Sequence, residues 1–261
     1  MNISFENKVV LVTGASEGIG LAIARAFGRD GAKVAICGRS QAKLDQAVAS
    51  LQADSIEVFA KTCDVTVFEQ FQAFADGAEA ALGPIDVFVN NAGYFPFCQL
   101  KDMDEALWDK TIDTNLKSAF LGAKIAYEKM KDHGGVIVNA SSFASKFNGV
   151  GYGAYAATKW GINVLTRTLA AELAPYGIRV FAYAPGVIDT ALTQEMISNH
   201  GEEGILAPIP LRRVGQPEDV ANVVEFLASD LGSYVSGCMV EIDGAKFSVQ
   251  NPPLAWNMAK N

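Results

Sequence analysis

Short apolar runs rich in Val and Ile alternate with longer segments of helical periodicity along most of this chain, and this alternation restricts the fold more than any other feature of the sequence. The runs predict strands at residues 8–13, 33–37, 56–61, 85–90, 136–141, 178–184 and 237–243. The segments between them predict helices at residues 19–29, 41–52, 67–81, 104–130 and 155–173. Because parallel strands need a crossover connection, usually a helix, we expect an α/β fold: a doubly wound sheet of about seven parallel strands with helices on both faces.

Composition and charge narrow the class of protein further. The chain of 261 residues is 50% hydrophobic and has no linker-like segment, so we expect one domain over residues 1–245 and a C-terminal tail at 246–261. Its net charge of -8 offers no basic run for nucleic acid or an anionic membrane. The absence of a long apolar segment or a basic leader favours a cytoplasmic protein. The cysteines lack CxxC spacing and the histidines lie far apart, so no metal site is expected.

The first predicted strand leads directly into the glycine-rich sequence TGASEGIG at residues 13–20. Gly14, Gly18 and Gly20 have the type of spacing that lets a turn approach a pyrophosphate at the N-terminus of the next helix. The same stretch also matches the G-x-S-x-G turn of hydrolases, with Ser16 as nucleophile and a distant histidine as base. A glycine-rich turn without a ligand is a third interpretation. The position after the first strand of the chain favours the dinucleotide turn.

The sequence GYGAYAATKWG at residues 151–161 places Tyr155 and Lys159 four residues apart, on one face of a predicted helix. An ammonium group beside a phenol stabilises the phenolate and lowers the pKa of the phenol from its usual value near 10. The pair could therefore exchange protons with a substrate, or it could lie on a solvated helix face. Tyr152 has Ala156 at the same spacing and lacks such a partner.

Several short motifs, taken in order, resemble the short-chain dehydrogenase/reductase family over about residues 7–245. They are TGASEGIG (13–20), CDV (63–65), NNAG (90–93), Asn115, Ser142, YAATK (155–159) and the Pro185-Gly186 pair. The resemblance implies a Rossmann-type fold, a homotetramer, and an NAD(P)-dependent oxidoreductase that interconverts a ketone and a secondary alcohol. The catalytic residues that it implies are Asn115, Ser142, Tyr155 and Lys159.

The roles of these residues follow from the reaction of the family. Hydride transfer to a ketone leaves an alkoxide oxygen that must be stabilised and protonated. Tyr155 would supply the proton, and Lys159, together with an oxidised nicotinamide, would lower the pKa of the Tyr155 phenol. Ser142 would donate a hydrogen bond to the same oxygen. Asn115 would hold a water that passes protons toward Lys159.

The resemblance also implies a set of cofactor contacts. Asp64 and Val65 would contact the adenine, although Asp64 could instead cap the following helix, and Ile188 and Thr190 would contact the carboxamide. The full set of expected cofactor-binding residues is Gly14, Ser16, Gly18, Ile19, Gly20, Arg39, Ser40, Asp64, Val65, Asn91, Ala92, Gly93, Tyr155, Lys159, Pro185, Gly186, Ile188 and Thr190.

The residues after the second strand favour NADP over NAD. An NAD-binding chain carries an acidic residue there, which accepts from the ribose 2'-hydroxyl. This chain has Gly38-Arg39-Ser40 instead, and the guanidinium of Arg39 suits a 2'-phosphate. Glu17 in the glycine turn would repel that phosphate, so NAD stays an alternative.

Aromatic residues gather in the sequence near the expected nicotinamide and near Ser142. We expect a substrate pocket formed by Ser142, Tyr94, Phe95, Phe143 and Tyr152, with a small or apolar carbonyl compound as the small-molecule substrate. The rings could instead fill the core. The alternative functions are a 3-oxoacyl thioester reductase of the fatty-acid type, an NAD-dependent polyol dehydrogenase and, more remotely, a dinucleotide sensor without turnover.

Two segments outside these motifs carry expectations of their own. Residues 191–209 correspond to a mobile loop over the substrate in relatives. In the tail, the prolines and Trp256 suggest an extended segment packed on a neighbouring subunit, with a disordered tail as the alternative.

Overall fold

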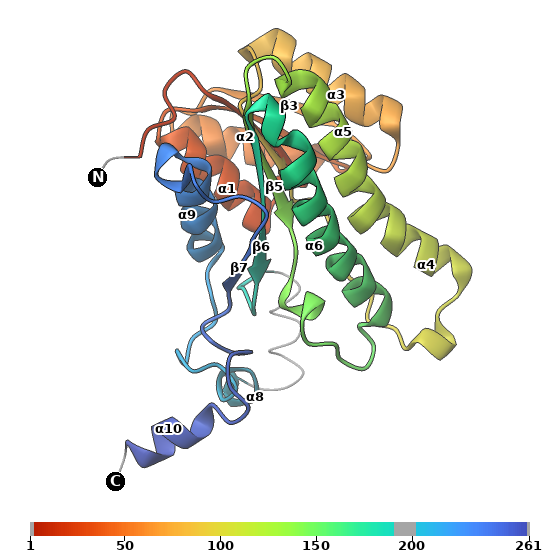
Figure 1. The fold of residues 1–261 in the computed structure, drawn as a ribbon, viewed down its shortest axis with the longest axis vertical. Helices are drawn as coiled ribbons and strands as arrows, with labels where there is room; N and C mark the ends of the chain where they lie inside the picture. The colour runs from red at the N-terminus through yellow and green to blue at the C-terminus, as the bar shows by residue number, and fades with distance from the viewer. Residues whose placement is uncertain (1–2, 191–201, 260–261) are drawn as a thin grey trace.

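Seven parallel strands form one sheet at the centre of the protein (Figure 1). The computed structural model describes residues 3–190 and 202–259. The strand order is β3-β2-β1-β4-β5-β6-β7, with every neighbouring pair parallel. The strands are β1 (Val9–Thr13), β2 (Lys33–Gly38), β3 (Val58–Thr62), β4 (Val87–Asn90), β5 (Gly135–Ala140), β6 (Ile178–Pro185) and β7 (Met239–Ile242). The predicted doubly wound α/β sheet is confirmed.

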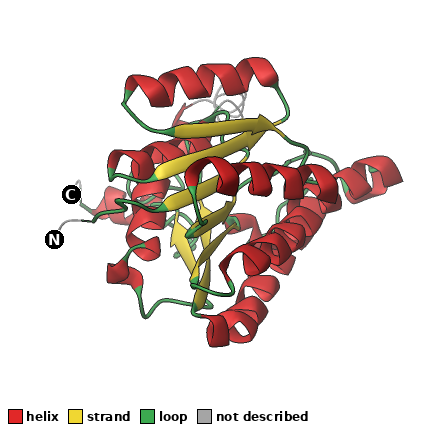
Figure 2. Cartoon of the chain, turned by 90° about the horizontal axis from the view of Figure 1, so that it is seen from above, coloured by secondary structure: helices red, strands yellow, loops and turns green. Residues whose placement is uncertain are grey.

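Helices cover both faces of the sheet, as Figure 2 shows from above. The helices on one face are α1 (Gly18–Arg29), α2 (Gln41–Ala53) and α9 (Pro217–Ala228). Those on the other are α3 (Phe68–Leu82), α5 (Ser118–Met130) and α6 (Gly153–Leu173), with α4 (Glu105–Ile112) against α6. The short helices are η1 (Leu100–Asp102), η3 (Phe143–Ser145), η4 (Ala174–Tyr176), α8 (Glu202–Leu206), η5 (Asp230–Gly232) and α10 (Pro253–Met258). No helix in the described ranges has both the length and the apolar character that crossing a bilayer requires.

Each strand contributes to two hydrophobic cores, because successive side chains along a strand point to opposite faces. In β1, Val10 and Val12 pack on the side of α1, whereas Leu11 packs with Phe88 on the side of α3. Complete burial of one such side chain stabilises the folded state by about 1.5–3 kcal/mol relative to an exposed one. The two cores together hold the ends of the strands, and therefore the loops that follow them, in fixed positions.

Among the element boundaries that differ from the sequence-based prediction, two have a clear structural reason. The helical stretch expected at 104–130 is divided by a π-helical segment, η2 (Asp113–Lys117), between α4 and α5. β3 begins at Val58 rather than at residue 56. Ile56 packs in the core on the side of α1, and its amide donates to the carbonyl oxygen of Leu51 at 3.1 Å, so it closes the end of α2 instead.

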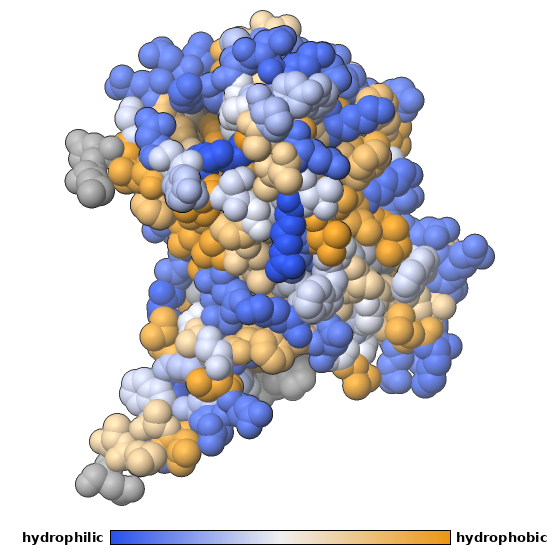
Figure 3. Space-filling model, in the orientation of Figure 1, coloured by the Kyte–Doolittle hydropathy of each residue, from blue (hydrophilic) through white to orange (hydrophobic). Residues whose placement is uncertain are grey.

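The C-terminal tail contacts its own chain near residue 210, and α10 projects from the main body of the protein (Figure 3). Residues Pro253–Met258 form α10, so the extended conformation predicted for the tail is wrong here; Pro253 is in the first helical turn, where its missing amide is tolerated. Trp256 Nε1 donates to the carbonyl oxygen of Pro210 at 2.8 Å, and the guanidinium of Arg212 lies 5.7 Å from the Trp256 ring centroid. Packing of the tail on a neighbouring subunit stays a prediction, and residues 191–201 of the expected substrate loop lie outside the described residues.

Arg179 on β6 joins this strand to the end of α9. The last carbonyl groups of a helix have no partners within the helix. The Arg179 guanidinium donates to such carbonyls and to those of the following turn, at 2.9–3.3 Å, in Leu227, Ala228, Ser229, Gly232 and Val235. One side chain therefore caps α9 and ties it to the sheet.

Candidate active site

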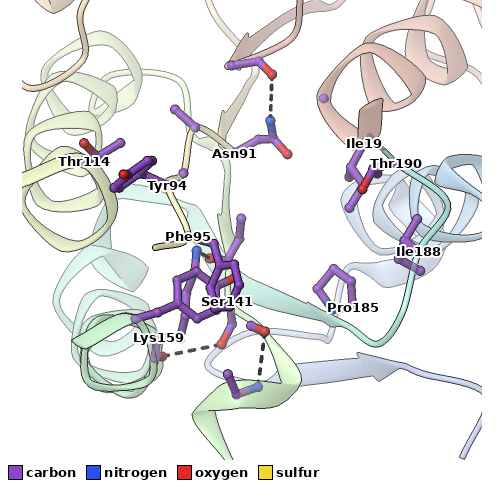
Figure 4. Close-up of a pocket in the computed structure, with 18 of the residues that line it drawn as sticks. Ile19, Asn91, Tyr94, Phe95, Thr114, Ser141, Lys159, Pro185, Ile188 and Thr190 are labelled. Atoms are coloured by element: carbon purple, nitrogen blue, oxygen red, sulfur yellow. Dashed lines mark hydrogen bonds between the residues drawn. The ribbon is translucent and has the colours of Figure 1, made fainter. Parts of the chain in front are cut away.

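A cavity of about 720 Å³ lies at the carboxyl ends of the strands, where the chain order reverses between β1 and β4. Open parallel sheets bind their ligands at such a switch point. Most of the predicted site residues line it, and Figure 4 draws part of the wall. They are Gly14, Ser16, Ile19, Gly20, Arg39, Asp64, Val65, Asn91, Ala92, Gly93, Tyr94, Phe95, Ser142, Phe143, Tyr152, Tyr155, Lys159, Pro185, Gly186, Ile188 and Thr190. The predicted residues that do not line it are Gly18, Ser40 and Asn115.

The glycine turn after β1 forms a tight cradle at the start of α1. Gly14 has a left-handed backbone with φ +63, and a Cβ there would lie 2.8 Å from the Ala92 Cα. A Cβ on Gly20 would lie 2.5 Å from Asn91 Nδ2, which donates to the carbonyl oxygens of Thr13 at 2.8 Å and Gly14 at 3.1 Å. Side chains are thus excluded where a pyrophosphate would approach the backbone and the positive end of the helix. The cradle fits a dinucleotide.

The surroundings of Ser16 do not suit the hydrolase alternative. A Cβ on Gly38 would lie 3.0 Å from Ser16 Oγ, so this serine packs against the end of β2. His133 precedes β5 and contacts the carbonyl oxygen of Ile85 before β4, at 3.1 Å. It therefore lies at the amino edge of the sheet, opposite Ser16, and His200 lies outside the described residues.

Tyr155 and Lys159 are adjacent on α6, as the spacing predicts. Lys159 Nζ lies 5.4 Å from the centroid of the Tyr155 ring and donates to the carbonyl oxygen of Ala140 at 2.7 Å. Burial lowers the pKa of the Lys159 ammonium to about 7. Burial also raises the pKa of the Tyr155 phenol, and a side-chain hydrogen bond with Ser142 opposes that rise. The three side chains therefore meet at one point of the cavity wall, and the pKa of one of them lies near neutral pH.

A buried polar network holds the loop that carries Ser142. Ser141 Oγ donates to Asn163 Oδ1 at 2.6 Å, and Asn163 Nδ2 donates to Ser145 Oγ at 2.9 Å. Ser145 Oγ in turn donates to the carbonyl oxygen of Ser142 at 2.7 Å. Ser141 thus lies on the cavity wall beside Lys159, as Figure 4 shows, but its hydroxyl is engaged by Asn163, whereas the Ser142 side chain hydrogen-bonds with Tyr155.

Asn115 is placed close to Lys159 but behind the cavity wall. It lies in the π-helical segment η2, and its side chain accepts from the Tyr94 amide at 2.7 Å and donates to the Tyr94 carbonyl oxygen at 2.8 Å. A Cβ on Gly93 would lie 3.3 Å from Asn115 Oδ1 and 3.8 Å from Lys159 Nζ. The neighbouring Thr114 lines the cavity instead. The side chain of Asn115 therefore fixes Tyr94, and the expected water at Asn115 stays a prediction.

At the end of the cavity where the adenosine is expected, Glu17 forms an ion pair that the sequence did not predict. Lys43 Nζ lies 2.8 and 2.9 Å from the two carboxylate oxygens of Glu17. Arg39 is exposed on the cavity wall, and Ser40 caps α2 by accepting from the Lys43 amide at 3.4 Å. Asp64 accepts from the amide and hydroxyl of Thr66 at 3.0 and 2.8 Å, so it closes a local turn before α3.

The aromatic residues form two groups on the cavity wall. Phe95 contacts the rings of Tyr152 and Tyr155 edge to face, with centroids 5.1 and 4.9 Å apart. Phe143 stacks on Phe247, a residue of the tail, with centroids 4.5 Å apart and an angle of 9°. The predicted rings thus lie on the cavity wall rather than entirely in the core.

Thr114, Tyr183, Lys246 and Phe247 are among the wall residues that were not predicted from the sequence. Tyr183 lies on β6, and its hydroxyl donates to Asn91 Oδ1 at 2.8 Å, which orients the amide that supports the glycine turn. Its place at the carboxyl end of a predicted strand was a usable signal. No local pattern marks Lys246 or Phe247, because they reach the cavity only when the tail folds back.

Comparisons with known proteins agree on one family. The family described as Enoyl-(Acyl carrier protein) reductase matches residues 14–245. Dehydrogenase/reductase SDR family member 4 of Homo sapiens is 40% identical, covering 91% of this chain and 87% of that protein. L-rhamnose 1-dehydrogenase (NAD(P)(+)) of Azotobacter vinelandii is 38% identical over 92% and 97% of the two chains. The 3-oxoacyl-(acyl-carrier-protein) reductase of Staphylococcus epidermidis is 37% identical over 92% and 99%.

Solved structures give the same result. A 7 alpha-hydroxysteroid dehydrogenase complexed with NADH and 7-oxo glycochenodeoxycholic acid superposes with a TM-score of 0.89 at 33% identity, covering 93% of this chain and 95% of that one. A short-chain type dehydrogenase/reductase from Mycobacterium marinum has a TM-score of 0.89 at 32% identity, over 94% and 98% of the chains.

Proposed function

Because this chain belongs to the short-chain dehydrogenase/reductase family and is an NAD(P)-dependent oxidoreductase, we propose that it interconverts a ketone and a secondary alcohol, with NADP(H) as cofactor and a small or apolar carbonyl substrate. The observation that carries this proposal is the meeting of Ser142, Tyr155 and Lys159 at one point of the cavity. Bound there, the nicotinamide supplies or accepts the hydride.

Proton transfer is the part of the reaction assigned to the chain's own residues. In the direction of reduction, Tyr155 gives its hydroxyl proton to the carbonyl oxygen, while Ser142 donates a hydrogen bond to that oxygen as charge develops on it. Protonated Lys159 beside the Tyr155 ring favours the phenolate that remains. Since the Lys159 pKa is about 7, the lysine can release and regain a proton at neutral pH, so it can reload Tyr155.

Three features at the adenosine end support NADP. The Arg39 guanidinium is exposed on the cavity wall, and no hydrogen bond or ion pair engages it within the described residues. Glu17, which opposed this cofactor in the sequence, is paired with Lys43, so its charge is largely balanced. A carboxylate side chain in place of Gly38 would have to displace Ser16, because its Cβ would lie 3.0 Å from Ser16 Oγ. The Arg39 guanidinium can then attract the 2'-phosphate without a strong opposing charge from Glu17.

A carrier-bound thioester is the second candidate, because the Staphylococcus epidermidis reductase acts on one by name. An acidic carrier needs a basic surface. Four cations on and near α5 and α6 could form one, and two of them are already engaged: Lys129 pairs with Asp76 and Glu79 at 2.7 and 2.6 Å, and Lys131 pairs with Glu128 at 2.7 Å. Lys124 and Arg167 are left without a carboxylate partner among the described residues, which is a small basic surface for an acidic carrier. We therefore favour free carbonyl compounds over carrier-bound ones, and the apolar wall favours them over the polyols of a polyol dehydrogenase. A sensor without turnover has no need of the Tyr155 and Lys159 pair.

The test is oxidation of NADPH and of NADH by the purified protein with a panel of free ketones, sugars and 3-oxoacyl thioesters. We expect turnover of apolar ketones with NADPH at rates that added salt changes little. Preference for a carrier-bound thioester, weakened by salt, would reverse the choice of substrate, and a preference for NADH would reverse the choice of cofactor. A homotetramer and a cytoplasmic location stay predictions from the family resemblance.

A further inference from the structure

A lysine in a turn after β7 reaches the aromatic part of the cavity. Lys246 and Phe247 both line the cavity, although neither belongs to a motif of the sequence. Phe247 stacks on Phe143 and also on Phe147, with centroids 4.5 and 5.2 Å apart. Because Phe143 directly follows Ser142 in the chain, this turn is docked beside the proposed reaction centre.

The turn that carries Lys246 is a built part of the wall. The Asp243 carboxylate accepts from the amides of Ala245 at 2.8 Å and Phe247 at 3.2 Å. Ala245 has a left-handed backbone with φ +66, a conformation that is strained for alanine and persists only where the surroundings enforce it. A Cβ on Gly186 would lie 2.7 Å from the Asp243 Cα, so the turn packs directly on the Pro185-Gly186 segment. These contacts hold Lys246 in position.

Lys246 lacks an anionic partner in this position. Within residues 3–190 and 202–259, its ammonium group makes no hydrogen bond or ion pair, and its recorded contact is with the Phe247 ring, 5.5 Å from the centroid. The Asp243 carboxylate is engaged by the two backbone amides. Burial lowers the pKa of the Lys246 ammonium, whereas the charge of Asp243 acts in the opposite direction. A partly buried cation of this kind gains from an anion that enters with a ligand.

The other charged residues on the described cavity wall lie near the expected cofactor or beside Tyr155. They are Glu17, Arg39 and Asp64 near the expected adenosine and Lys159 beside Tyr155. Lys246 is therefore the charge available to the part of a substrate that points away from the nucleotide and from the reacting oxygen.

We infer that Lys246 binds a carboxylate of the substrate, so that the preferred substrate is an apolar ketone, or the matching secondary alcohol, with an acidic group remote from the reacting carbon. This inference rests on the proposed function and deepens it. The Phe95 and Phe143 groups would enclose the apolar body, and Lys246 would bind its acidic end. A neutral ketone leaves the ammonium without a partner, and a sugar offers hydroxyl groups but no charge.

The experiment compares two ketones of the same shape, 4-acetylbenzoate and its methyl ester, with NADPH as the reductant. In the wild-type protein we expect kcat/KM to be at least about tenfold higher for the acid at low ionic strength, as a charge-assisted contact provides. The acid-to-ester ratio should fall as salt rises, because a partly exposed ion pair is screened. In Lys246→Met the ratio should drop at least fivefold, and Lys246→Arg should keep most of it.

A control lysine and a binding measurement separate this effect from a general loss of charge or of fold. Lys33 lies at the amino edge of β2, paired with Glu57 at 3.6 Å, so Lys33→Met should leave both rates unchanged. Calorimetry of the product acid, 4-(1-hydroxyethyl)benzoate, with the NADP-loaded protein should give a Kd about tenfold weaker in Lys246→Met.

Two outcomes distinguish the inference from the function on which it rests. If the wild type reduces the ester as well as the acid, or if the ratio survives in Lys246→Met, the inference is wrong while ketone reduction stands. If the wild type reduces neither compound nor any other ketone with either nucleotide, the proposed function itself fails.

Discussion

The lowered pKa of Lys159 makes a prediction about stability that is independent of any substrate. Lys159 is 3% exposed, and burial lowers its pKa from 10.5 to about 7. The unfolded chain regains the ordinary value, so between these two pH values the unfolded state binds more protons than the folded state. Stability therefore rises with pH across this window, by up to about 1.4 kcal/mol per pH unit. Between pH 7 and pH 9 the gain from this one group is about 2 kcal/mol.

The assay is urea denaturation of the wild type and of Lys159→Met at pH 7, 8 and 9, at one fixed protein concentration because assembly adds to apparent stability. Methionine keeps the length of the side chain and cannot be charged. The free energy of unfolding of the variant relative to the wild type should fall by about 2 kcal/mol from pH 7 to pH 9. Lys33→Met, which removes a half-exposed lysine at the amino edge of β2, is the control variant and is measured in the same way. If the difference in unfolding free energy between Lys159→Met and the wild type does not change with pH, the lysine is not desolvated. The proposed transfer of a proton from Lys159 to Tyr155 at neutral pH would then lose its basis.

Three further predictions concern single positions. Tyr155→Phe should lower turnover at least about a hundredfold while nucleotide binding persists, whereas Tyr152→Phe should be mild; near-normal rates in the first variant would contradict the proton-transfer role. Arg39→Asp should raise the KM for NADPH far more than the KM for NADH, since it places a repulsive charge at the 2'-phosphate, and equal changes would remove the basis for NADP. Burial, and then the charge of Asp30, raise the pKa of Glu225 to about 7, so the stability from this group is complete below pH 4.5 and is lost as pH rises through 7. Glu225→Gln should therefore gain about 1–2 kcal/mol over the wild type from pH 5 to pH 8 in urea denaturation, and no change with pH would refute the assigned cause.

Those parts of the molecule that follow a local rule could be predicted from the sequence. The strands and helices follow from periodicity, and helical spacing alone places Lys159 beside Tyr155. The family motifs likewise predicted that Ser142, rather than Ser141, joins them. The structure adds the physical reason, because Asn163 and Ser145 engage the hydroxyl of Ser141 although this residue also lies on the cavity wall.

The parts that depend on distant contacts could not be predicted. Glu17 seemed to oppose NADP because its pairing with Lys43, on the next helix, leaves no trace in local spacing. Asn115 faces the Tyr94 backbone because a π-helical segment rotates it, which helical periodicity does not record. Phe247 reaches the cavity only through the strained turn at Ala245, and such a turn is unexpected without glycine.

The contacts of Arg179 also bear on how the protein is made. The carbonyl groups that receive its guanidinium lie 48 to 56 residues further along the chain. During translation at about 5–20 residues per second, roughly 2–11 s therefore pass before the half-buried Arg179 of β6 can find these partners. In that interval a nascent chain exposes the edge of an unfinished parallel sheet, which is the kind of surface that chaperones bind and that aggregates when they do not. The open edge of β6 is covered only once α9 and β7 have been synthesised, because Arg179 binds the end of α9 and β6 pairs with β7.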